Sequence, residues 1–206
     1  MLFGMKGSQG GIQYSDGIVG HIIKNGGTPQ DDGTIGAYSE GLPYLASYSA
    51  AQLTYDGLLS AFEVMFDPAR GGSLAKLCLA SLPVVSHFNK LGGFMDNSLS
   101  GVQNYNFESS QGAFGHKVMR IETVHGDVSI VKEPLFRNNA SGHMCFVDLD
   151  NVSYRPLVGN GLNRDTAIQT NVQAADEDLR KDMILTEAGL EVSLPESHAL
   201  INLEGA

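Results

Sequence analysis

The sequence has no tryptophan, only two cysteines, and no apolar run that approaches the roughly 20 residues of a membrane-spanning helix. Its first residues also lack the basic start and apolar stretch of a secretory signal peptide. We therefore expect a protein without a membrane segment that stays in the compartment where it is made. Both thiols, Cys78 and Cys145, lie in apolar runs and are interpreted as buried and reduced, with a disulfide or a reactive thiol as the alternatives.

Clusters of positive charge are missing as well. The chain carries 13 Lys and Arg against 23 Asp and Glu, a net charge of −10, and its basic residues are scattered. Proteins that bind DNA or RNA through its phosphates use clustered Lys and Arg, so the scattered basic residues argue against phosphate-mediated binding of nucleic acid. The acidity favours solubility and carries no information about the fold.

Catalytic signatures are also absent. None of the patterns HExxH, CxxC, GxxxxGK(S/T) and GxGxxG occurs in the sequence. Gly159-Asn160-Gly161 is a partial match to a dinucleotide-binding turn, but it lacks the third glycine. No catalytic, cofactor-binding or metal-ligating residue is therefore assigned, and we expect the protein not to be an enzyme.

Two groups of polar residues are weaker candidates for a site. His116, His125 and His143 lie at the ends of predicted strands and would suit a metal, although scattered histidines are more often solvated or hydrogen-bonded. Asp148 and Asp150 fall on the same side of a strand, as in a cation site or an acid/base pair. We favour an acidic strand end that leads into a turn, because the sequence offers these carboxylates no nucleophile or electrophilic partner.

Glycine, in contrast, is abundant, with 25 residues concentrated in Gly4–Gly41 and Gly92–Gly115. Such long loops in a compact domain are usually functional or interactive, and plain disorder is the alternative. Met1–Tyr48 is interpreted as an irregular lead-in. Within it, only Gly17–Ile23 is typical of a strand or a buried segment.

The middle of the chain predicts a helix, a strand and a second helix. Apolar residues recur at helical spacing over Leu53–Phe66, and Thr54 is a good N-cap. Leu74–Ala80 is a short apolar run bounded by turns, which indicates a buried strand. The second helix is predicted to begin near Pro83 and to end at Gly92-Gly93.

The second half of the chain predicts mainly strands. Val118–Val124 and Val128–Val131 alternate around a short turn, which indicates a hairpin. Further strands are predicted over Met144–Leu149, Val152–Val158, Met183–Leu194 and Ala199–Leu203, whereas Asn163–Asp178 is polar and shows no period. Helices mixed with antiparallel strands indicate the α+β class.

Residues 53–91, LTYDGLLSAFEVMFDPARGGSLAKLCLASLPVVSHFNKL, resemble the axial-domain core of tailed-phage major capsid proteins. In that family an amphipathic helix leads to a short buried strand, a polar small residue with proline, and another helix. The later phrases RIETVHGDVSIVKEPLF, GHMCFVDLDNVSYRPLVGNG and DEDLRKDMILTEAGLEVSLPESHALINL are similar to the family's strand pair, peripheral-domain strand and closing arm. The resemblance covers Gly4 to Leu203.

The resemblance implies a phage major-capsid-like α+β fold, with an axial domain of mixed sheet and flanking helices and the long antiparallel strands of a partial peripheral domain. The implied divisions are a glycine-rich lead-in (1–52), the axial core (53–149), peripheral strands (150–196) and a C-terminal strand returning to the axial domain (197–206). The implied function is that of a structural subunit of an icosahedral phage head, made in the host bacterial cytoplasm and located in the virion.

The partners that the resemblance implies are copies of the chain in hexamers and pentamers, with scaffolding, portal or decoration proteins as further partners. Packaged DNA would be contacted only non-specifically, and no membrane is involved. Family members usually carry an N-terminal arm, a long loop and a spine helix ahead of the position of Leu2. We therefore expect the chain to be a fragment, or those parts to reside in another chain.

Other functions remain open at this stage. One is an encapsulin-like compartment shell protein, which shares the fold and holds cargo enzymes. Another is a small metal- or ligand-binding α+β protein that uses the histidines with Asp148 and Asp150. A phage head-stabilising or tail component is a further alternative.

Overall fold

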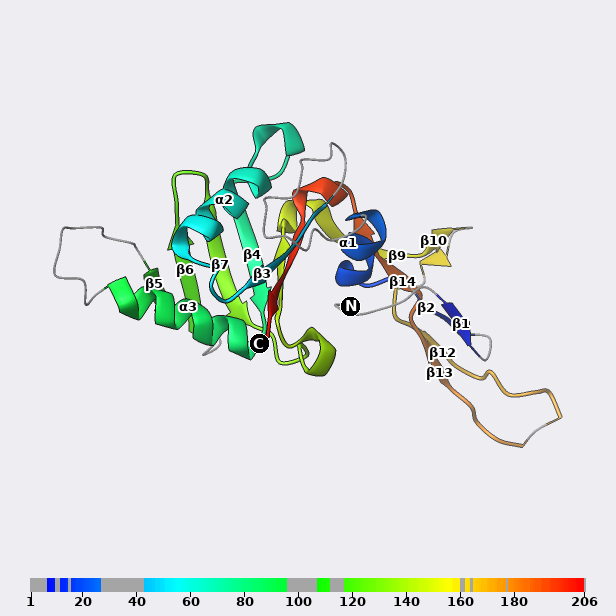
Figure 1. The fold of residues 1–206 in the computed structure, drawn as a ribbon. Helices are drawn as coiled ribbons and strands as arrows, with labels where there is room; N and C mark the ends of the chain where they lie inside the picture. Colours follow the sequence, from blue (N-terminus) through cyan, green and yellow to red (C-terminus); the bar gives the residue numbers. More distant parts are fainter. Residues whose placement is uncertain are drawn as a thin grey trace.

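The computed structural model describes residues 7–9, 12–14, 16–26, 43–95, 107–111, 117–159, 162–163, 165–176 and 178–205. Its centre is a seven-stranded sheet with the strand order β3-β15-β8-β4-β7-β6-β5 (Figure 1). In chain order these strands are β3 Tyr44–Ser49, β4 Ala75–Ala80, β5 Phe107–Gln111, β6 Lys117–Glu122, β7 Asp127–Lys132, β8 His143–Val147 and β15 Ala199–Glu204. β15 runs parallel to β3, and β4 runs parallel to β7, whereas the other neighbours are antiparallel.

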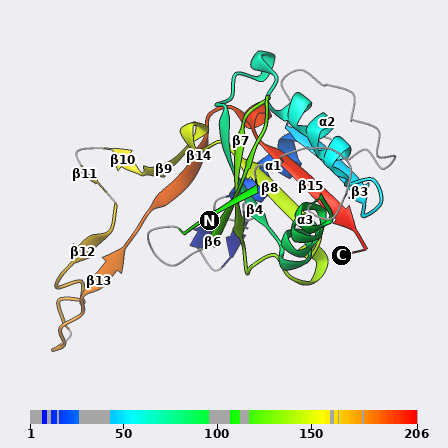
Figure 2. The same cartoon turned by 90° about the vertical axis from the view of Figure 1, so that its left-hand side faces the viewer.

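Helices cover both faces of this mixed sheet. α2 (Tyr55–Met65) and α3 (Leu82–Met95) lie on one face, and α1 (Ile18–Gly26) lies on the other (Figures 1 and 2). Short 3-10 helices connect the strands: η1 Pro68–Arg70, η2 Asn138–Ala140, η3 Leu149–Asn151 and η4 Pro195–Ser197. The predicted α+β class, a mixed sheet with flanking helices, is confirmed.

The side chains of the central strands alternate between two apolar layers. In β8, Met144 and Phe146 pack in the cluster beneath α2 and α3, whereas Cys145 and Val147 pack in the cluster beneath α1. This period of two is the natural consequence of the strand pleat. The central strands are therefore buried on both faces, which makes the sheet a rigid base.

The two thiols lie on opposite faces of the sheet. Cys78 on β4 belongs to the layer under α2 and α3, and Cys145 belongs to the layer under α1. Both are buried and free of disulfides, as predicted. Burial raises the pKa of the Cys145 thiol to about 12 and also raises the pKa of Cys78. Thiolate chemistry at neutral pH is correspondingly disfavoured.

The predicted helix-strand-helix order is confirmed, with one change of boundary. The Thr54 side chain caps α2 by accepting a hydrogen bond from the Gly57 N–H at 3.3 Å. α3 does not end at Gly92-Gly93 but continues to Met95. A glycine in a helix interior is less favourable than alanine by only about 1 kcal/mol, so two glycines weaken a helix without ending it.

Two interpretations of the N-terminal part need correction. Gly17–Ile23, predicted as a strand or a buried segment, is buried but belongs mostly to helix α1, where Ile18, Val19 and Ile22 are buried at helical spacing. Met1–Tyr48 is not irregular throughout either, since most of β3 falls within it. β3 is an edge strand of the main sheet, and its partner β15 lies at the opposite end of the chain.

The remaining strands form separate antiparallel pairs. The pairs are β1 (Gly7–Gln9) with β2 (Ile12–Tyr14), β9 (Val152–Pro156) with β14 (Ala188–Val192), β10 (Val158–Gly159) with β11 (Leu162–Asn163), and β12 (Ala167–Gln169) with β13 (Met183–Leu185). The single strand predicted over Met183–Leu194 is thus two strands with different partners. The polar segment Asn163–Asp178 holds β12, whose three residues are too few to show a period.

Of the predicted loops, residues 27–42 and most of Gly92–Gly115 lie outside the described residues. The second loop is interrupted by the end of α3 and by β5.

Gly126, in the turn between β6 and β7, is expected not to tolerate a side chain. A Cβ atom there would lie 2.6 Å from the Leu74 carbonyl oxygen and 2.6 Å from Cε1 of Phe66. That carbonyl cannot move freely, because it accepts a hydrogen bond from the Asp127 N–H at 2.8 Å. Gly126→Ala should lower the free energy of unfolding by about 1–3 kcal/mol in urea denaturation.

The matched control is Gly189→Ala in β14, where an added Cβ meets nothing within 4 Å. Its effect should stay within about 0.5 kcal/mol. Equal effects of the two substitutions would contradict the steric explanation.

Candidate functional site

Residues 152–192, which we call the ribbon, leave the sheet as paired strands. β9 and β14 form the part nearest the sheet, and β12 and β13 form a more distant part (Figures 1 and 2). In the part of the chain that the structure describes, neither pair has a third strand beside it. A two-stranded ribbon is only marginally stable in water by itself.

Large apolar side chains are exposed along the ribbon. More than half of the exposed large apolar residues in the described part of the chain belong to it: Tyr154, Leu157, Val158, Ile168, Val172, Leu179, Met183 and Ile184. Ile168 and Ile184 lie directly opposite each other on β12 and β13 and are 69% and 71% exposed. Apolar side chains gathered in this way on a projecting element typically mark a contact with another protein.

Polar contacts hold the ribbon together locally. Arg155 Nη1 donates to both carboxylate oxygens of Glu191, at 2.7 and 2.6 Å, across the β9–β14 pair. Farther out, the Thr166 and Thr186 hydroxyls lie 3.1 Å apart. Exposed ion pairs contribute little to stability, so these contacts set register more than they stabilise the ribbon.

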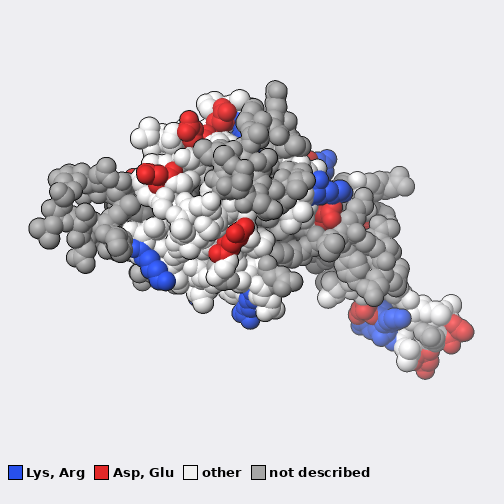
Figure 3. Space-filling view, in the orientation of Figure 1, with Lys and Arg blue, Asp and Glu red and all other residues white. Residues whose placement is uncertain are grey.

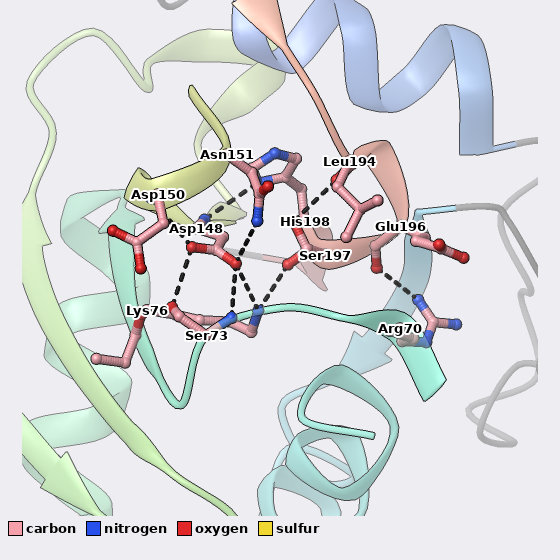
Figure 4. Close-up of polar contacts among 11 residues, drawn as sticks. Arg70, Ser73, Lys76, Asp148, Asp150, Asn151, Leu194, Glu196, Ser197 and His198 are labelled. Atoms are coloured by element: carbon pink, nitrogen blue, oxygen red, sulfur yellow. Dashed lines mark hydrogen bonds and ion pairs between the residues drawn. The ribbon is translucent and has the colours of Figure 1, made fainter. Parts of the chain in front are cut away.

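The base of the ribbon is tied to the sheet by a buried polar cluster (Figure 4). Asp148, which follows β8 and is 0% exposed, is its central acceptor. Its Oδ2 accepts from the Ser73 N–H at 2.8 Å and from Asn151 Nδ2 at 2.9 Å. Its Oδ1 accepts from the Ser73 hydroxyl at 3.0 Å and from the Asp150 N–H at 3.2 Å.

Lys76 brings a buried cation from β4 into this cluster. It is 3% exposed, donates from Nζ to the Ser197 carbonyl at 2.7 Å, and lies 4.0 Å from Asp148 Oδ2. Burial lowers the pKa of Lys76, and Asp148 opposes that shift. Burial alone would raise the pKa of Asp148, but hydrogen bonds from Ser73 and Asn151, together with Lys76, bring it below its ordinary value.

His198 completes the cluster from the other end of the ribbon. It is 1% exposed, and its Nδ1 accepts a hydrogen bond from the Asp148 N–H at 3.1 Å. An accepting Nδ1 requires a neutral ring with its proton on Nε2. Burial and the nearby Lys76 lower the pKa of His198 to about 4, although Asp148 acts in the opposite direction.

Space in the cluster is tight. A Cβ atom on Gly72 would lie 2.8 Å from Lys76 Nζ and 3.1 Å from Asp148 Oδ2. On the outer side, Arg70 Nη1 donates to the Glu196 carbonyl at 3.1 Å. Glycine at position 72 therefore leaves the space in which Lys76 and Asp148 approach each other.

The structure separates the two carboxylates considered from the sequence. Asp148 is buried and its oxygens are occupied by donors, whereas the Asp150 side chain is exposed on η3. The arrangement is therefore a structural acceptor site and not an acid/base pair. The sequence interpretation of an acidic strand end missed the burial of Asp148.

Of the three histidines considered as metal ligands, the two that the structure describes, His125 and His143, do not join a group of potential ligands. His143 stacks on Phe136 with ring centroids 6.5 Å apart, His125 lies in the β6–β7 turn, and His116 lies outside the described residues. Among the residues that can be described, no group of three or more His, Cys, Asp or Glu could hold a metal ion. Gly159 belongs to β10, and the two residues after it lie outside the described part.

Lys76 and His198 were missed by sequence reasoning. The only available signal for Lys76 was a single cation inside the apolar run LAKLCLA. A long charged residue in a buried strand is rare unless it is paired, so the run itself implied a partner. Nothing in the sequence identified the Ser197 carbonyl or the Asp148 carboxylate as that partner, and nothing indicated that His198 is buried beside them.

The surface carries no continuous basic patch in the described part that Figure 3 displays. In that view Lys and Arg side chains form small, scattered groups, several of them beside acidic side chains. Searched over the described residues, the structure has no helix long and apolar enough to cross a membrane.

Residues 6–204 match a family model of viral major capsid proteins, which defines the class of this α+β subunit. The family is the SU10 major capsid protein family, and the chain belongs to it. A search of curated proteins found no match. The resemblance to phage major capsid proteins that the sequence indicated is confirmed, and the protein has a structural role in a capsid.

Proposed function

We propose that copies of this chain assemble into hexamers and pentamers that form an icosahedral phage head around the DNA genome. The observation that carries the proposal is the ribbon, whose exposed Ile168 and Ile184 have no cover within the described part of the chain. Copies that contact one another around closed symmetry axes form rings, and such rings can tile a shell. A neighbouring copy would remove these apolar side chains from water.

The chain is proposed to divide into an axial domain, which contains the sheet, and peripheral strands, which contain the ribbon. Residues 53–149 form most of the axial core, and 150–196 are the peripheral strands. Residues 197–206 return to the sheet, where β15 pairs with both β3 and β8. The lead-in 1–52 also contributes to the axial domain through β3, and for that reason we include β3 in the core.

The charge of the chain fits a container for DNA. A net charge of −10 and scattered basic residues suit a shell that encloses the genome without binding its phosphates tightly. The subunits would be made in the host bacterial cytoplasm and end in the virion, with scaffolding, portal or decoration proteins as further partners. An encapsulin-like shell would hold cargo enzymes instead, so the content of the particles distinguishes the two.

The test is negative-stain electron microscopy of particles from bacteria that express the complete gene. Uniform round shells are expected, and nuclease-protected DNA in particles from infected cells would favour the phage head over the compartment. Dispersed subunits under all assembly conditions would contradict the proposal.

The contact is tested by replacing both ribbon isoleucines by serine, Ile168→Ser with Ile184→Ser. Each buried isoleucine contributes roughly 1.5–3 kcal/mol, so the concentration needed for assembly should rise by more than about tenfold. Val124→Ser is the matched control, because it removes an exposed apolar side chain from the β6–β7 turn. Normal assembly of the double variant would exclude this ribbon face as the contact, and the shell proposal would then rest on the family match alone.

A further inference from the structure

The ribbon is attached to the body by two segments, which we call its roots. The first root, Asp148–Asn151, leads from β8 into β9, and the second root, Ser193–His198, leads from β14 into β15. Both roots lie beside the start of β4 (Figure 4). The direction in which the ribbon leaves the sheet therefore depends on contacts among these three segments.

Buried bonds join the roots to β4 and to each other. Lys76 Nζ on β4 donates to the Ser197 carbonyl of the second root at 2.7 Å and lies 4.0 Å from the carboxylate of Asp148 in the first. Between the roots, the Asp148 N–H donates to His198 Nδ1 at 3.1 Å, and the Ser193 N–H donates to the Asn151 carbonyl at 2.9 Å.

We infer that Lys76, Asp148 and His198 form a latch that holds both roots of the ribbon against β4, and that acid opens the latch when His198 takes up a proton. The inference goes beyond the proposed function, because it concerns the unassembled chain. Only its consequence for assembly, a change in ribbon direction, rests on the shell proposal.

Protonation removes the acceptor on which the contact between the roots depends. A charged imidazolium carries hydrogens on both nitrogens, so His198 Nδ1 would face the Asp148 N–H as a second donor. The added charge would also be buried near the Lys76 ammonium. Opening the roots relieves both effects by exposing the ring to water.

Burial of the ring, together with the charges around it, sets the pH at which His198 takes up a proton. Lys76 on β4 disfavours the proton, and Asp148 after β8 favours it. α1 also packs against η4 and carries half-buried His21, together with exposed Lys24, which pairs with Asp16 at 3.6 Å. Burial and, after it, Lys76 lower the pKa of His198 to about 4 in the closed latch although Asp148 opposes them, against about 6.5 for an exposed histidine.

These two values fix the sign and the window of the effect. Above about pH 6.5 the ring is neutral in both states, and the closed latch is favoured. As the pH falls from about 6.5 toward 4, the ring takes up a proton in the open state but not in the closed one, so the closed latch becomes less favoured. Between pH 7 and pH 5 the equilibrium should shift toward the open latch by about 20-fold. Asp148 does not titrate in this window, because its pKa lies below the ordinary value of 3.8.

The test is hydrogen exchange of the unassembled chain, followed by mass spectrometry at pH 7, 6 and 5 with intrinsic rates corrected for pH. Protection of Val152–Pro156 and Ala188–Val192 should fall by about 20-fold from pH 7 to pH 5, while protection of β4 and β8 stays within a few fold. Unchanged protection of the ribbon strands would overturn the latch.

Two variants separate the latch from a general effect of acid. His198→Asn keeps an acceptor near the position of Nδ1 and cannot titrate, so the pH dependence should shrink to about twofold or less. His125→Asn, which removes a histidine from the β6–β7 turn, should keep the full dependence. If His198→Asn retains the wild-type pH profile, histidine protonation is not the trigger.

A direct titration covers the case in which the His198 variant folds poorly. In the wild-type chain, the His198 ring followed by nuclear magnetic resonance should remain neutral until opening begins, well below pH 6. A normal histidine titration near pH 6.5 with the ribbon still protected would refute the inference.

Discussion

Replacing Asp148 by alanine should lower the free energy of unfolding by about 3–5 kcal/mol in urea denaturation. The carboxylate is fully buried and accepts hydrogen bonds from Ser73 and Asn151. Its removal leaves these donors without their acceptor and leaves the buried Lys76 cation uncompensated. Each unsatisfied buried donor alone costs about 1–3 kcal/mol.

Asp150→Ala is the matched control, because it removes a carboxylate two residues away whose side chain is exposed. We expect a change within about 0.5 kcal/mol. Adding Lys76→Met to Asp148→Ala should recover part of the loss, since the double variant no longer buries an unpaired charge. Strict additivity of the two substitutions would show that Lys76 and Asp148 do not interact.

Phe62→Ala should be comparably severe, lowering the free energy of unfolding by about 3–5 kcal/mol. Phe62 is 1% exposed at the centre of the layer between α2 and the sheet. Its ring meets Phe66 edge-on at 5.9 Å and Phe146 of β8 at 6.0 Å. The rigid sheet beneath cannot collapse into the space, so the substitution leaves a cavity.

The neighbouring Glu63→Ala replaces an exposed side chain on the same helix and should change stability by no more than about 0.5 kcal/mol. A double-mutant cycle between Phe62 and Phe146 should give a coupling of about 0.5–1.5 kcal/mol. A loss below about 1 kcal/mol for Phe62→Ala would mean that α2 does not pack on the sheet as described.

The two sets of substitutions probe different tasks of the same subunit. The apolar layers stabilise the sheet, and the polar cluster connects that sheet to the ribbon. In the proposed assembly the ribbon must keep a fixed direction relative to the sheet, because every copy repeats the same contact around the shell. Phe62→Ala and Asp148→Ala should both reduce the amount of folded subunit, the first by opening a cavity and the second by leaving buried donors and a buried cation without their partner.

Prediction from the sequence succeeded where the signal was local. Thr54 and the helical spacing after it identified α2, because a cap and an amphipathic stripe lie within a few turns of chain. The hairpin β6–β7 was recognisable from alternation around a short turn. Prediction failed where glycine was taken as a stop in α3, and where strands of two or three residues were too short to carry a pattern.

The sequence by itself determined the α+β class, the helix-strand-helix core and the buried free thiols, because these follow from short-range periodicity, and the resemblance of its phrases to phage major capsid proteins indicated the family. Only the tertiary structure decided that β3 pairs with β15 and that Lys76 meets Ser197, 121 positions later. The run LAKLCLA implies that Lys76 has a partner, but no local pattern identifies that partner or the partner of β3, because the fold brings both from the far end of the chain.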